Sequence, residues 1–509
     1  MIIGIDLGTT YSLAGTIDLD QRPVLLPDNS DKTVLYTPSI VHINGNNAFV
    51  GQTVLNMLEQ NPGLDVIRFF KRYLGEKKEL HIDSDGNVWY PEAIAALVLK
   101  KINFDAEIYA SNSVDGAVIT VPAHFDDAQR KAILNAAAMI DLSVLGLLEE
   151  PVAAAIYYGV SQNAHEQNIL VYDLGGGTFD ATVLTVNEKG FYVMSKDGLT
   201  DMGGKEFDEA MASLIQGQFE KAAGKPLLFT GSKLQQLRVF SEEVKIELAS
   251  PGVKYINRIC LLGNDSIEVF ITRKEFENAI TFEVDRTIKI LKRCLSSAGL
   301  TEDIIDTLLM VGGSSMIPFV RQRIEQEMPA LAGKIRYQDP MKAVVFGAAH
   351  YAKMLSSDHS DTDNSDLPSE LRGVTGYNIA LRAVNPETGR TVMDILIPKN
   401  RPIPVKIKRT YYTAPNSGGR MRLELLQFIE EQEAKTLGVL NVGPLPTNKA
   451  NYPIEITIEY TEDGIIVLQA YNAETGLELE KTFGKEGMGA NYLAGQKKIV
   501  QKTFINNTL

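Results

Sequence analysis

The sequence is short of cysteine, histidine and positive charge, and each shortage excludes a class of protein. The 509-residue chain has two cysteines, Cys260 and Cys294, which are too few for a disulfide framework. Its six histidines are scattered, and no Cys-x-x-Cys or His-x-x-x-His spacing occurs, so we expect no structural zinc site. The formal net charge is −14, which argues against a general affinity for nucleic acid because that affinity needs a basic surface.

Long apolar runs are missing as well. No stretch approaches the roughly 18 consecutive apolar residues that a membrane-spanning helix needs. The opening segment MIIGIDLGTT reads as a strand and has no basic leader of the secretory kind. We therefore expect a cytoplasmic protein with no membrane partner. Hydrophobic residues make up 44% and charged residues 22%, as in ordinary globular proteins, and the length predicts two or more domains.

The pattern of apolar residues changes along the chain. Residues 1–355 alternate apolar, β-branched segments with helix-like segments, which predicts an α/β architecture. Residues 356–372 are mostly polar and acidic and are expected to form a linker. Residues 373–487 alternate polar and apolar side chains between Gly, Pro and Asn turns, which predicts an all-β sandwich. We expect the last segment, 488–509, to be a short tail with at most one short helix and no helical lid.

One motif occurs twice. Residues 4–17 and 171–184 each read as an apolar strand, then Asp-Leu-Gly, then a Gly/Thr turn, then a second strand. The two aspartates, Asp6 and Asp173, are separated by 167 positions (173 minus 6). This repeat predicts a duplicated hairpin, one copy in each lobe of a two-lobed domain. A third glycine turn follows an apolar strand at 308–318.

Such turns suit the binding of phosphate. Glycine lets the backbone approach closely, and the exposed N–H groups form a concave row of donors for phosphate oxygens. Asp6 and Asp173 at strand ends are placed to hold Mg²⁺ through its retained waters. Either turn alone is also compatible with an ordinary hairpin, but the repetition favours a nucleotide site. The chain has neither a Walker-type phosphate loop nor a kinase-type glycine loop with its His-Arg-Asp partner.

An ordered series of motifs over residues 1–355 resembles the heat shock protein 70 chaperones. It includes GIDLGTTYS (4–12), KRYLG (71–75), AVITVPAHFDDAQR (117–130), EEPVAAAIYYG (149–159), VYDLGGGTFD (171–180), GGKEFD (203–208), SEEVKIELAS (241–250) and VGGSSMIP (311–318). The β-rich part is more weakly similar to the peptide-binding sandwich of that family, best at LIPKNRPIP (396–404). The resemblance implies a two-lobed, actin-like ATPase domain followed by the sandwich.

The resemblance also implies roles for particular residues. The catalytic residues implied are Lys71, Glu150, Asp173 and Thr178. Asp6 and Asp173 would hold the metal ion Mg²⁺, and K⁺ is a further candidate ion. Taken alone, Lys71 in its basic segment would read as a solvated surface charge. ATP or ADP would contact Gly8, Thr9, Thr10, Tyr11, Gly175, Gly176, Gly177, Thr178, Gly203, Gly204, Glu242, Lys245, Gly312, Gly313 and Ser314. An interdomain relay is implied for Pro122 and Arg130, and a peptide site for Leu381, Val384, Tyr411, Ala414, Met421 and Leu423, where ordinary sandwich core is the alternative.

The chain departs from the family pattern at several points. Met316 stands where the family usually has an arginine that packs on adenine, and Ala249 stands where it often has a serine, so we expect weaker or altered adenine binding. The linker lacks the usual apolar strand, which puts coupling between the domains in doubt. The missing lid predicts fast exchange of bound peptide.

Three functions remain open on the sequence. The first is an ATP-dependent chaperone that binds extended hydrophobic polypeptide, with a J-domain co-chaperone and a nucleotide exchange factor as further partners. The second is a nucleotide-binding interaction protein that holds one dedicated partner with little or no hydrolysis. The third is a small-molecule kinase of the actin-like fold, since fold alone does not exclude one.

Overall fold

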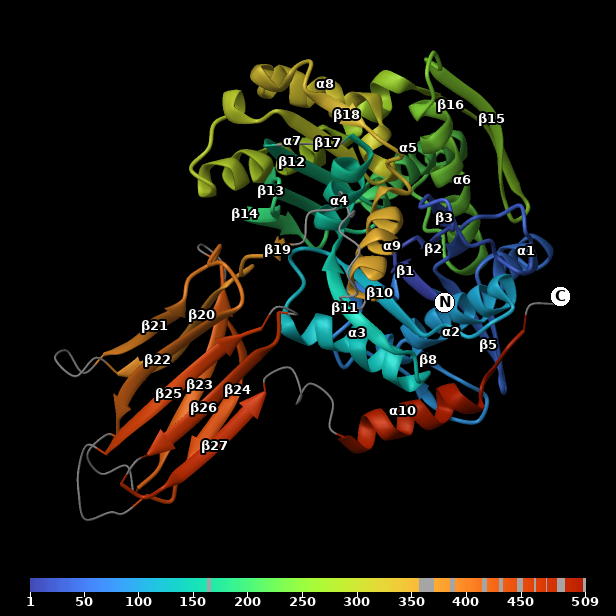
Figure 1. Ribbon diagram of the computed structural model, residues 1–509. Helices are drawn as coiled ribbons and strands as arrows, with labels where there is room; N and C mark the ends of the chain where they lie inside the picture. The colour runs from blue at the N-terminus through green and yellow to red at the C-terminus, as the bar shows by residue number, and fades with distance from the viewer. Residues whose placement is uncertain are drawn as a thin grey trace.

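The computed structural model describes most of the chain in detail. The described residues are 1–162, 166–356, 370–384, 390–413, 419–429, 434–445, 452–461, 464–472, 474–482 and 490–506. Figure 1 shows two α/β lobes and a separate β-sandwich that lies beside them. None of the described helices is long and apolar enough to cross a membrane.

Lobe I comprises residues 1–162 together with α9 (Ala343–Ser356). Its main sheet has the order β11-β10-β1-β2-β3, and the short β4 also pairs with β2. The helices of this lobe begin with recognisable signals, such as Pro91 at the start of α2. The elements are β1 (Ile2–Asp6), β2 (Tyr11–Ile17), β3 (Pro23–Leu25), β4 (Thr37–Pro38), α1 (Gln52–Gln60), η1 (Phe70–Tyr73), β8 (His81–Ile82), β9 (Val88–Trp89), α2 (Pro91–Ala110), β10 (Gly116–Val121), α3 (Asp127–Met139), β11 (Val144–Glu149) and α4 (Glu150–Gln162).

Lobe II comprises residues 166–342 together with β19 (Glu370–Arg372). Its six-stranded sheet has the order β18-β17-β12-β13-β14-β19, and a long helix, α7, begins at a capping box formed by Thr272 and Glu275. The elements are β12 (Gln167–Leu174), β13 (Phe179–Asn187), β14 (Gly190–Leu199), α5 (Gly204–Ala223), α6 (Gly231–Ala249), β15 (Tyr255–Leu262), β16 (Asp265–Thr272), α7 (Arg273–Ser297), η2 (Glu302–Ile304), β17 (Thr307–Val311), η3 (Gly313–Met316), α8 (Pro318–Glu327), η4 (Pro329–Leu331) and β18 (Ile335–Tyr337).

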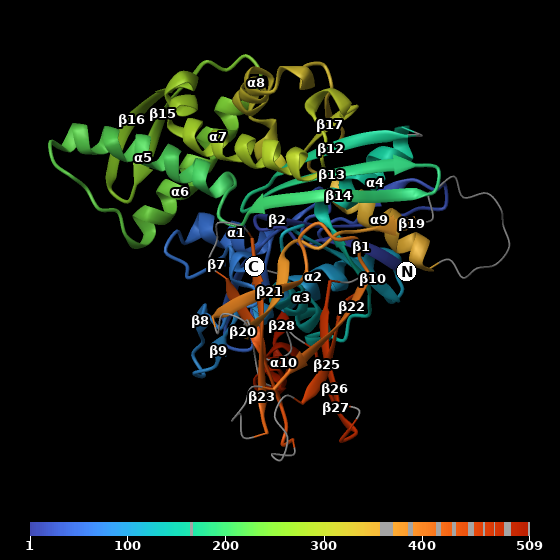
Figure 2. The ribbon, with the colours of Figure 1, turned by 90° about the vertical axis from the view of Figure 1, so that its left-hand side faces the viewer.

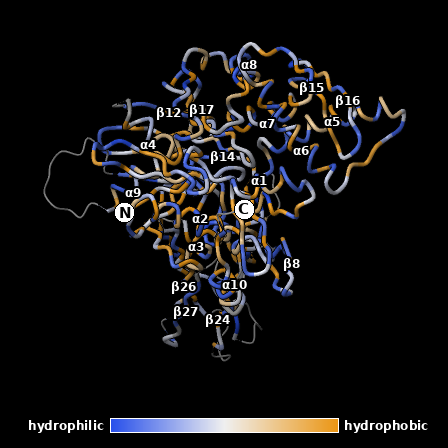
Figure 3. Tube along the Cα trace, turned by 90° about the vertical axis from the view of Figure 1, so that its right-hand side faces the viewer, coloured by the Kyte–Doolittle hydropathy of each residue, from blue (hydrophilic) through white to orange (hydrophobic). Residues whose placement is uncertain are grey.

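The duplicated hairpin predicted from the sequence is confirmed. In lobe I, β1 runs antiparallel to β2 and parallel to β10; in lobe II, β12 runs antiparallel to β13 and parallel to β17. Asp6 and Asp173 therefore occupy matching places on the two sheets. A shared core of residues from both sheets, α4 and α9 lies beneath the two hairpins, and Figure 3 shows hydrophobic segments running through this interior.

The sandwich consists of two four-stranded antiparallel sheets, β21-β20-β23-β24 and β22-β25-β26-β27. Apolar residues of both sheets meet in one core, and the regular polar and apolar alternation of β25 matches a strand with one buried face. The strands are β20 (Asn378–Val384), β21 (Thr391–Ile397), β22 (Val405–Tyr412), β23 (Met421–Phe428), β24 (Lys435–Val442), β25 (Pro453–Tyr460), β26 (Ile466–Asn472) and β27 (Leu477–Thr482).

Part of the segment expected to be a linker is a strand of the lobe II sheet. Residues Glu370–Arg372 form β19, which pairs in parallel with the start of β14. The pairing is close, because a Cβ atom added to Gly190 would lie 1.9 Å from the carbonyl oxygen of Glu370. The remaining linker residues, 357–369, lie outside the described residues. The chain thus enters the sandwich directly from the edge of lobe II.

The C-terminal segment returns to lobe I. Helix α10 (Ala490–Lys502) packs on α2 and α3, and β28 (Phe504–Ile505) extends a small sheet of lobe I in the order β28-β6-β5-β7. The other strands of that sheet are β5 (Ile40–Asn44), β6 (Asn47–Val50) and β7 (Ile67–Arg68). Val500 is fully buried in the lobe I core. The tail was expected to form at most one short helix, and the described part contains α10, which packs on lobe I, as Figure 1 shows.

Candidate nucleotide site

The two repeated turns face each other across a cleft between the lobes. A Cβ atom added to Gly176 would lie 2.1 Å from the hydroxyl oxygen of Thr10, and one added to Gly177 would lie 2.7 Å from the hydroxyl oxygen of Thr9. A side chain at either position would collide with the facing threonine side chain, so glycine is what leaves room for the two turns to pack. The cleft is lined by Asp6, Gly8, Thr9, Thr10, Tyr11, Leu13, Lys71, Glu150, Asp173, Gly175, Gly176, Thr178, Val311, Gly312, Gly313, Pro340, Met341 and Val344.

A buried ion pair lies at the bottom of this cleft. The Lys71 ammonium, on the 3₁₀ helix η1, lies 2.5 Å from Oε1 of Glu150, and the two side chains are 3% and 10% exposed. Glu150 is the first residue of α4, where a negative charge is favoured by the helix dipole. The surface-charge alternative for Lys71 is therefore excluded by its burial. The ammonium still has donors to offer to a ligand.

Two further carboxyl groups crowd the same space. Burial and the neighbouring Glu150 raise the pKa of Asp6 to about 7, although Thr120 donates a hydrogen bond to it. Burial raises the pKa of Asp173 well above its usual range, and Glu150, Asp180 and Asp6 act in the same direction. Three acidic groups thus share one lysine, an excess of negative charge that a bound cation would relieve.

This arrangement fits Mg²⁺ held together with phosphate. No group of three or more His, Cys, Asp or Glu side chains in the described parts of the chain is close enough to enclose a metal by itself. Mg²⁺ commonly uses one or two carboxylates, substrate phosphates and several retained waters. Asp6 and Asp173, one from each lobe, are the residues that would hold the ion in this way.

The outer part of the cleft is built by lobe II. Gly312 and Gly313 line it, and the Ser314 hydroxyl lies behind them, donating to the Gly175 carbonyl at 2.9 Å. The Lys245 ammonium lies 2.7 Å from Asp208 and also approaches the Gly204 carbonyl. Gly203 lies against the backbone of Gly177. These residues, together with Glu242 on α6, surround the part of the cleft where the nucleoside of ATP is predicted to bind. Glu242 and Lys245 are not among the residues that line the cleft.

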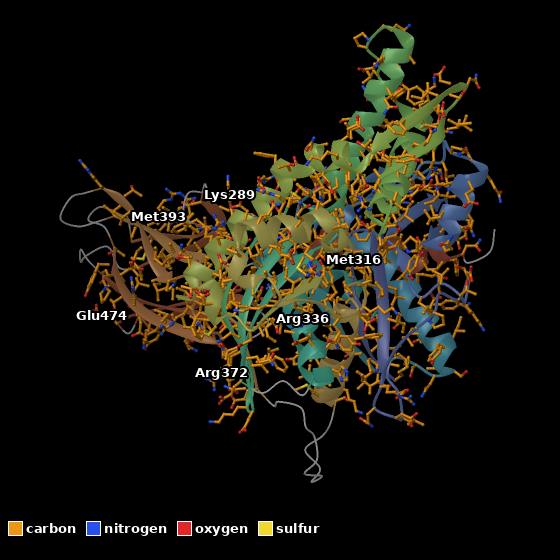
Figure 4. The ribbon with its side chains drawn as sticks, turned by 90° about the horizontal axis from the view of Figure 1, so that it is seen from above. Lys289, Met316, Arg336, Arg372, Met393 and Glu474 are labelled. Carbon is orange, nitrogen blue, oxygen red and sulfur yellow. The ribbon has the colours of Figure 1, made fainter. Side chains whose placement is uncertain are left out.

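Several residues of this region were not found from the sequence. Pro340 and Met341 line the cleft from the loop after β18, and Asp208 pairs with Lys245. A loop position and a single acidic residue carry no pattern that would single them out. Met316, labelled in Figure 4, is 51% exposed on η3, so it offers a thioether at the surface where the family has a guanidinium.

A chain of charges leads from the cleft to the sandwich. The Arg130 guanidinium donates to Glu149 at 2.7 Å, and the Lys196 ammonium lies 2.5 Å from the same carboxylate oxygen. Glu149 immediately precedes Glu150 in the sequence, and no role was predicted for it. Gly464 of the sandwich packs directly on the Arg130 side chain. Pro122 opens the turn before α3, where its carbonyl accepts from the Phe125 N–H.

The sandwich contacts lobe I at the start of α3 and lobe II at β14. Asp126 caps α3 with one carboxylate oxygen and accepts from Gln427 and Lys435 of the sandwich with the other. The neighbouring Asp127 accepts from the Ile466 N–H at 3.2 Å. On lobe II, Lys399 lies 3.5 Å from Asp197. Both lobes therefore hold the sandwich through buried or half-buried polar contacts.

The predicted peptide-binding residues do not share one exposed surface. Leu381 and Leu423 are buried in the sandwich core, and Tyr411 and Met421 pack against that core. Val384 is 64% exposed at the end of β20. Ala414 lies outside the described residues. Most of the predicted peptide-binding residues that the structure describes therefore belong to the sandwich core or pack against it. Their role in peptide binding stays a prediction.

The geometry described above defines a class of protein. Two α/β lobes, repeated strand–turn–strand units on either side of a cleft, and a following β-sandwich are the architecture of an actin-like ATPase joined to a substrate-binding domain. The sequence matches the family described as Hsp70 protein over residues 2–492 of 509, and the chain belongs to that family. Members are chaperones of the Hsp70 type and are ATPases in general.

Proposed function

We propose that this protein is an ATP-dependent chaperone that binds ATP with Mg²⁺ in the interlobe cleft, hydrolyses it slowly, and binds extended hydrophobic polypeptide in the sandwich. The observation that carries the proposal is the convergence of Lys71, Glu150, Asp6 and Asp173 between two facing phosphate-type turns. A protein that bound nucleotide for structure alone would not need this buried and strained set of charges.

In the proposed reaction the chain supplies positioning and charge. The backbone N–H groups of residues 176–178 and the hydroxyls of Thr9 and Thr10 hold the phosphates, while the Gly175 N–H donates to the Thr178 carbonyl within the turn. Lys71 donates to the γ-phosphate and to the attacking water, and Glu150 accepts a hydrogen bond from that water. Asp6 and Asp173 would hold Mg²⁺, which would supply positive charge against the phosphates. Phosphoryl transfer needs this positioning and electrostatic support more than covalent help from the protein.

Single-turnover hydrolysis of ATP tests the catalytic assignment. Lys71→Ala is expected to lower the rate by about 10²- to 10³-fold, as loss of one electrostatic stabiliser does, while ATP still binds. The exposed Lys77→Ala serves as a matched control and is expected to keep the wild-type rate. Wild-type protein that binds ATP but does not hydrolyse it would overturn the proposed ATPase activity.

Binding of a fluorescent, extended apolar peptide tests the second half of the proposal. We expect binding that is weaker with ATP than with ADP, fast exchange of peptide, and faster hydrolysis when peptide is present. Val384→Asp is expected to weaken the binding, whereas Leu228→Asp, at an exposed position of lobe II, is not. Hydrolysis that ignores peptide would contradict coupling of the two domains. A J-domain co-chaperone, an exchange factor and a cytoplasmic location remain predictions that accompany this function.

One observation favours a second candidate function. The described peptide-site residues are mostly core, and the C-terminal helix is seated on lobe I, as in a protein that keeps its domains docked. We infer as the alternative a nucleotide-binding interaction protein that holds one dedicated partner. Binding of nucleotide without hydrolysis, together with no affinity for apolar peptides, would favour this alternative.

A further inference from the structure

Arg68 is half-buried, and two of its three guanidinium nitrogens are buried without a hydrogen-bond partner among the described residues. It is the last residue of β7 and stands opposite Ile40 of β5 on lobe I. Its Nε and Nη2 atoms are both shielded from solvent, and within the described parts of the chain neither has a hydrogen-bond partner. A buried charged donor left unpaired is costly to a protein. The arrangement therefore indicates that a group outside the chain completes it.

The surroundings of Arg68 place it at the cleft. The charged and titratable groups that act on it are Glu242 and Arg238 on α6 of lobe II and Tyr11 of the cleft lining. Burial lowers the pKa of Arg68, and Glu242 and Tyr11 act in the opposite direction. Among the described residues, no carboxylate lies within 4.0 Å of its guanidinium. Figure 2 shows β7 and α6 on opposite sides of the boundary between the lobes.

We propose that Arg68 is a nucleotide-binding residue whose guanidinium contacts the sugar–base end of ATP or ADP from lobe I, opposite Glu242. This inference rests on the proposed nucleotide binding. The phosphate end of the cleft already has Lys71 and two rows of backbone donors. At the nucleoside end, Met316 is neutral and the Lys245 ammonium is engaged by Asp208. A planar guanidinium can both donate hydrogen bonds to sugar hydroxyls and stack on a base.

A binding role and a structural role make opposite predictions for stability. If Arg68 serves nucleotide, replacing it by an apolar residue removes an unpaired buried charge from the empty protein. Arg68→Met is then expected to raise the thermal midpoint without nucleotide and to reduce the upward shift that saturating ATP produces. If Arg68 held the lobes together by itself, the same variant would lower the midpoint without nucleotide.

Calorimetric titration with ATP, ADP and inorganic tripolyphosphate tests the assignment directly. For Arg68→Met we expect ATP and ADP to bind about tenfold more weakly, because one hydrogen bond to a charged group is worth about that much. The affinity for tripolyphosphate should stay within about twofold of the wild-type value, because this ligand has no sugar or base. Arg238→Met, which removes an exposed arginine near the same Glu242, serves as the control for long-range charge and is expected to change ATP affinity by less than threefold.

Each outcome decides the proposal. The proposal is overturned if Arg68→Met leaves the ATP affinity unchanged or weakens tripolyphosphate binding as much as ATP binding. It is also overturned if Arg238→Met loses as much ATP affinity as Arg68→Met, or if Arg68→Met lowers the thermal midpoint of the protein without nucleotide. Wild-type protein that binds ATP while Arg68→Met behaves identically refutes only the role of Arg68. Wild-type protein that binds no nucleotide refutes both this inference and the proposed function.

Discussion

The Arg72 guanidinium donates two parallel hydrogen bonds to the Glu206 carboxylate, each 2.8 Å long, and joins lobe I to lobe II. Arg72 directly follows Lys71, and Glu206 lies in the first turn of α5, just after the glycines that face the phosphate turn. The two side chains are 11% and 19% exposed. This bidentate pair bridges the two lobes next to Lys71, and bidentate pairs are among the stronger polar contacts.

Loss of the Arg72–Glu206 pair is expected to speed the release of nucleotide. Arg72→Ala should release a fluorescent ADP analogue about tenfold faster, which corresponds to about 1.4 kcal/mol, because the lobes separate more readily. Stopped-flow displacement measures this rate. Glu206→Gln should act in the same direction, whereas Lys221→Ala, at an exposed position in the last turn of the same helix, should not. An unchanged release rate in Arg72→Ala would contradict a closing role for the pair.

A second prediction concerns Met316. Replacing it by arginine is expected to strengthen ATP binding by about 0.5 to 2 kcal/mol, the range for a cation over an aromatic ring, since the side chain lies exposed beside the glycine turn that lines the cleft. Affinities for ATP and GTP measured side by side on wild type and Met316→Arg give the result. The prediction is contradicted if the wild type already binds ATP tightly and in preference to GTP, and if Met316→Arg does not increase the affinity for ATP. The Met316 thioether would then be sufficient for adenine binding.

The docking of the sandwich is expected to depend on pH through Asp127. Burial raises the pKa of this carboxyl from 3.8 to about 7, despite the hydrogen bond from Ile466. The docked protein therefore binds more protons than the undocked protein between about pH 4 and pH 7. Docking should weaken as the pH rises through this window and level off above it.

Energy transfer between labels on lobe I and the sandwich, recorded from pH 5 to pH 8, measures this dependence. Asp127→Asn, which keeps a hydrogen-bond acceptor but does not titrate, should remove most of it. The same pH profile in wild type and Asp127→Asn would place the titrating group elsewhere.

A fourth prediction concerns the C-terminal helix. Val500 is fully buried between α10 and lobe I, and the Lys100 ammonium donates to the Val500 and Thr503 carbonyls at 3.0 Å and 2.7 Å. Val500→Asp should lower the free energy of unfolding by at least about 3 kcal/mol, because a charge enters an apolar core. Urea unfolding checks it, with the exposed Lys498→Asp as control. Equal stability of the two variants would mean that α10 contributes nothing to lobe I.

The fold was largely predictable because its elements carry strong local patterns. The repeated Asp-Leu-Gly turns predicted the two hairpins, and the change from helical to alternating patterns predicted an α/β part followed by a sandwich. Strand β19 was not predictable, because Glu-Leu-Arg has no strand pattern and is held by backbone pairing at a sheet edge. The position of α10 on lobe I depends on packing against α2 and α3, which are far away in the sequence. A single sequence does not reveal such contacts.

The site was predictable only in part. Glycine turns and strand-end aspartates follow from local chemistry, and the family resemblance pointed to Lys71 and Glu150. Glu149 lies between two cations, and Asp208 pairs with Lys245, so both contacts join residues that are far apart in sequence. Their pairing depends on the relative placement of the lobes and the sandwich, for which no local pattern exists.

The sandwich is attached to different lobes at its two ends. It follows β19 in the lobe II sheet and precedes α10 and β28, which belong to lobe I. The nucleotide cleft lies between the same two lobes. A rotation of one lobe relative to the other would therefore move these two anchor points relative to each other. We expect a motion at the cleft to reach the sandwich through both anchor points as well as through the polar contacts at its surface.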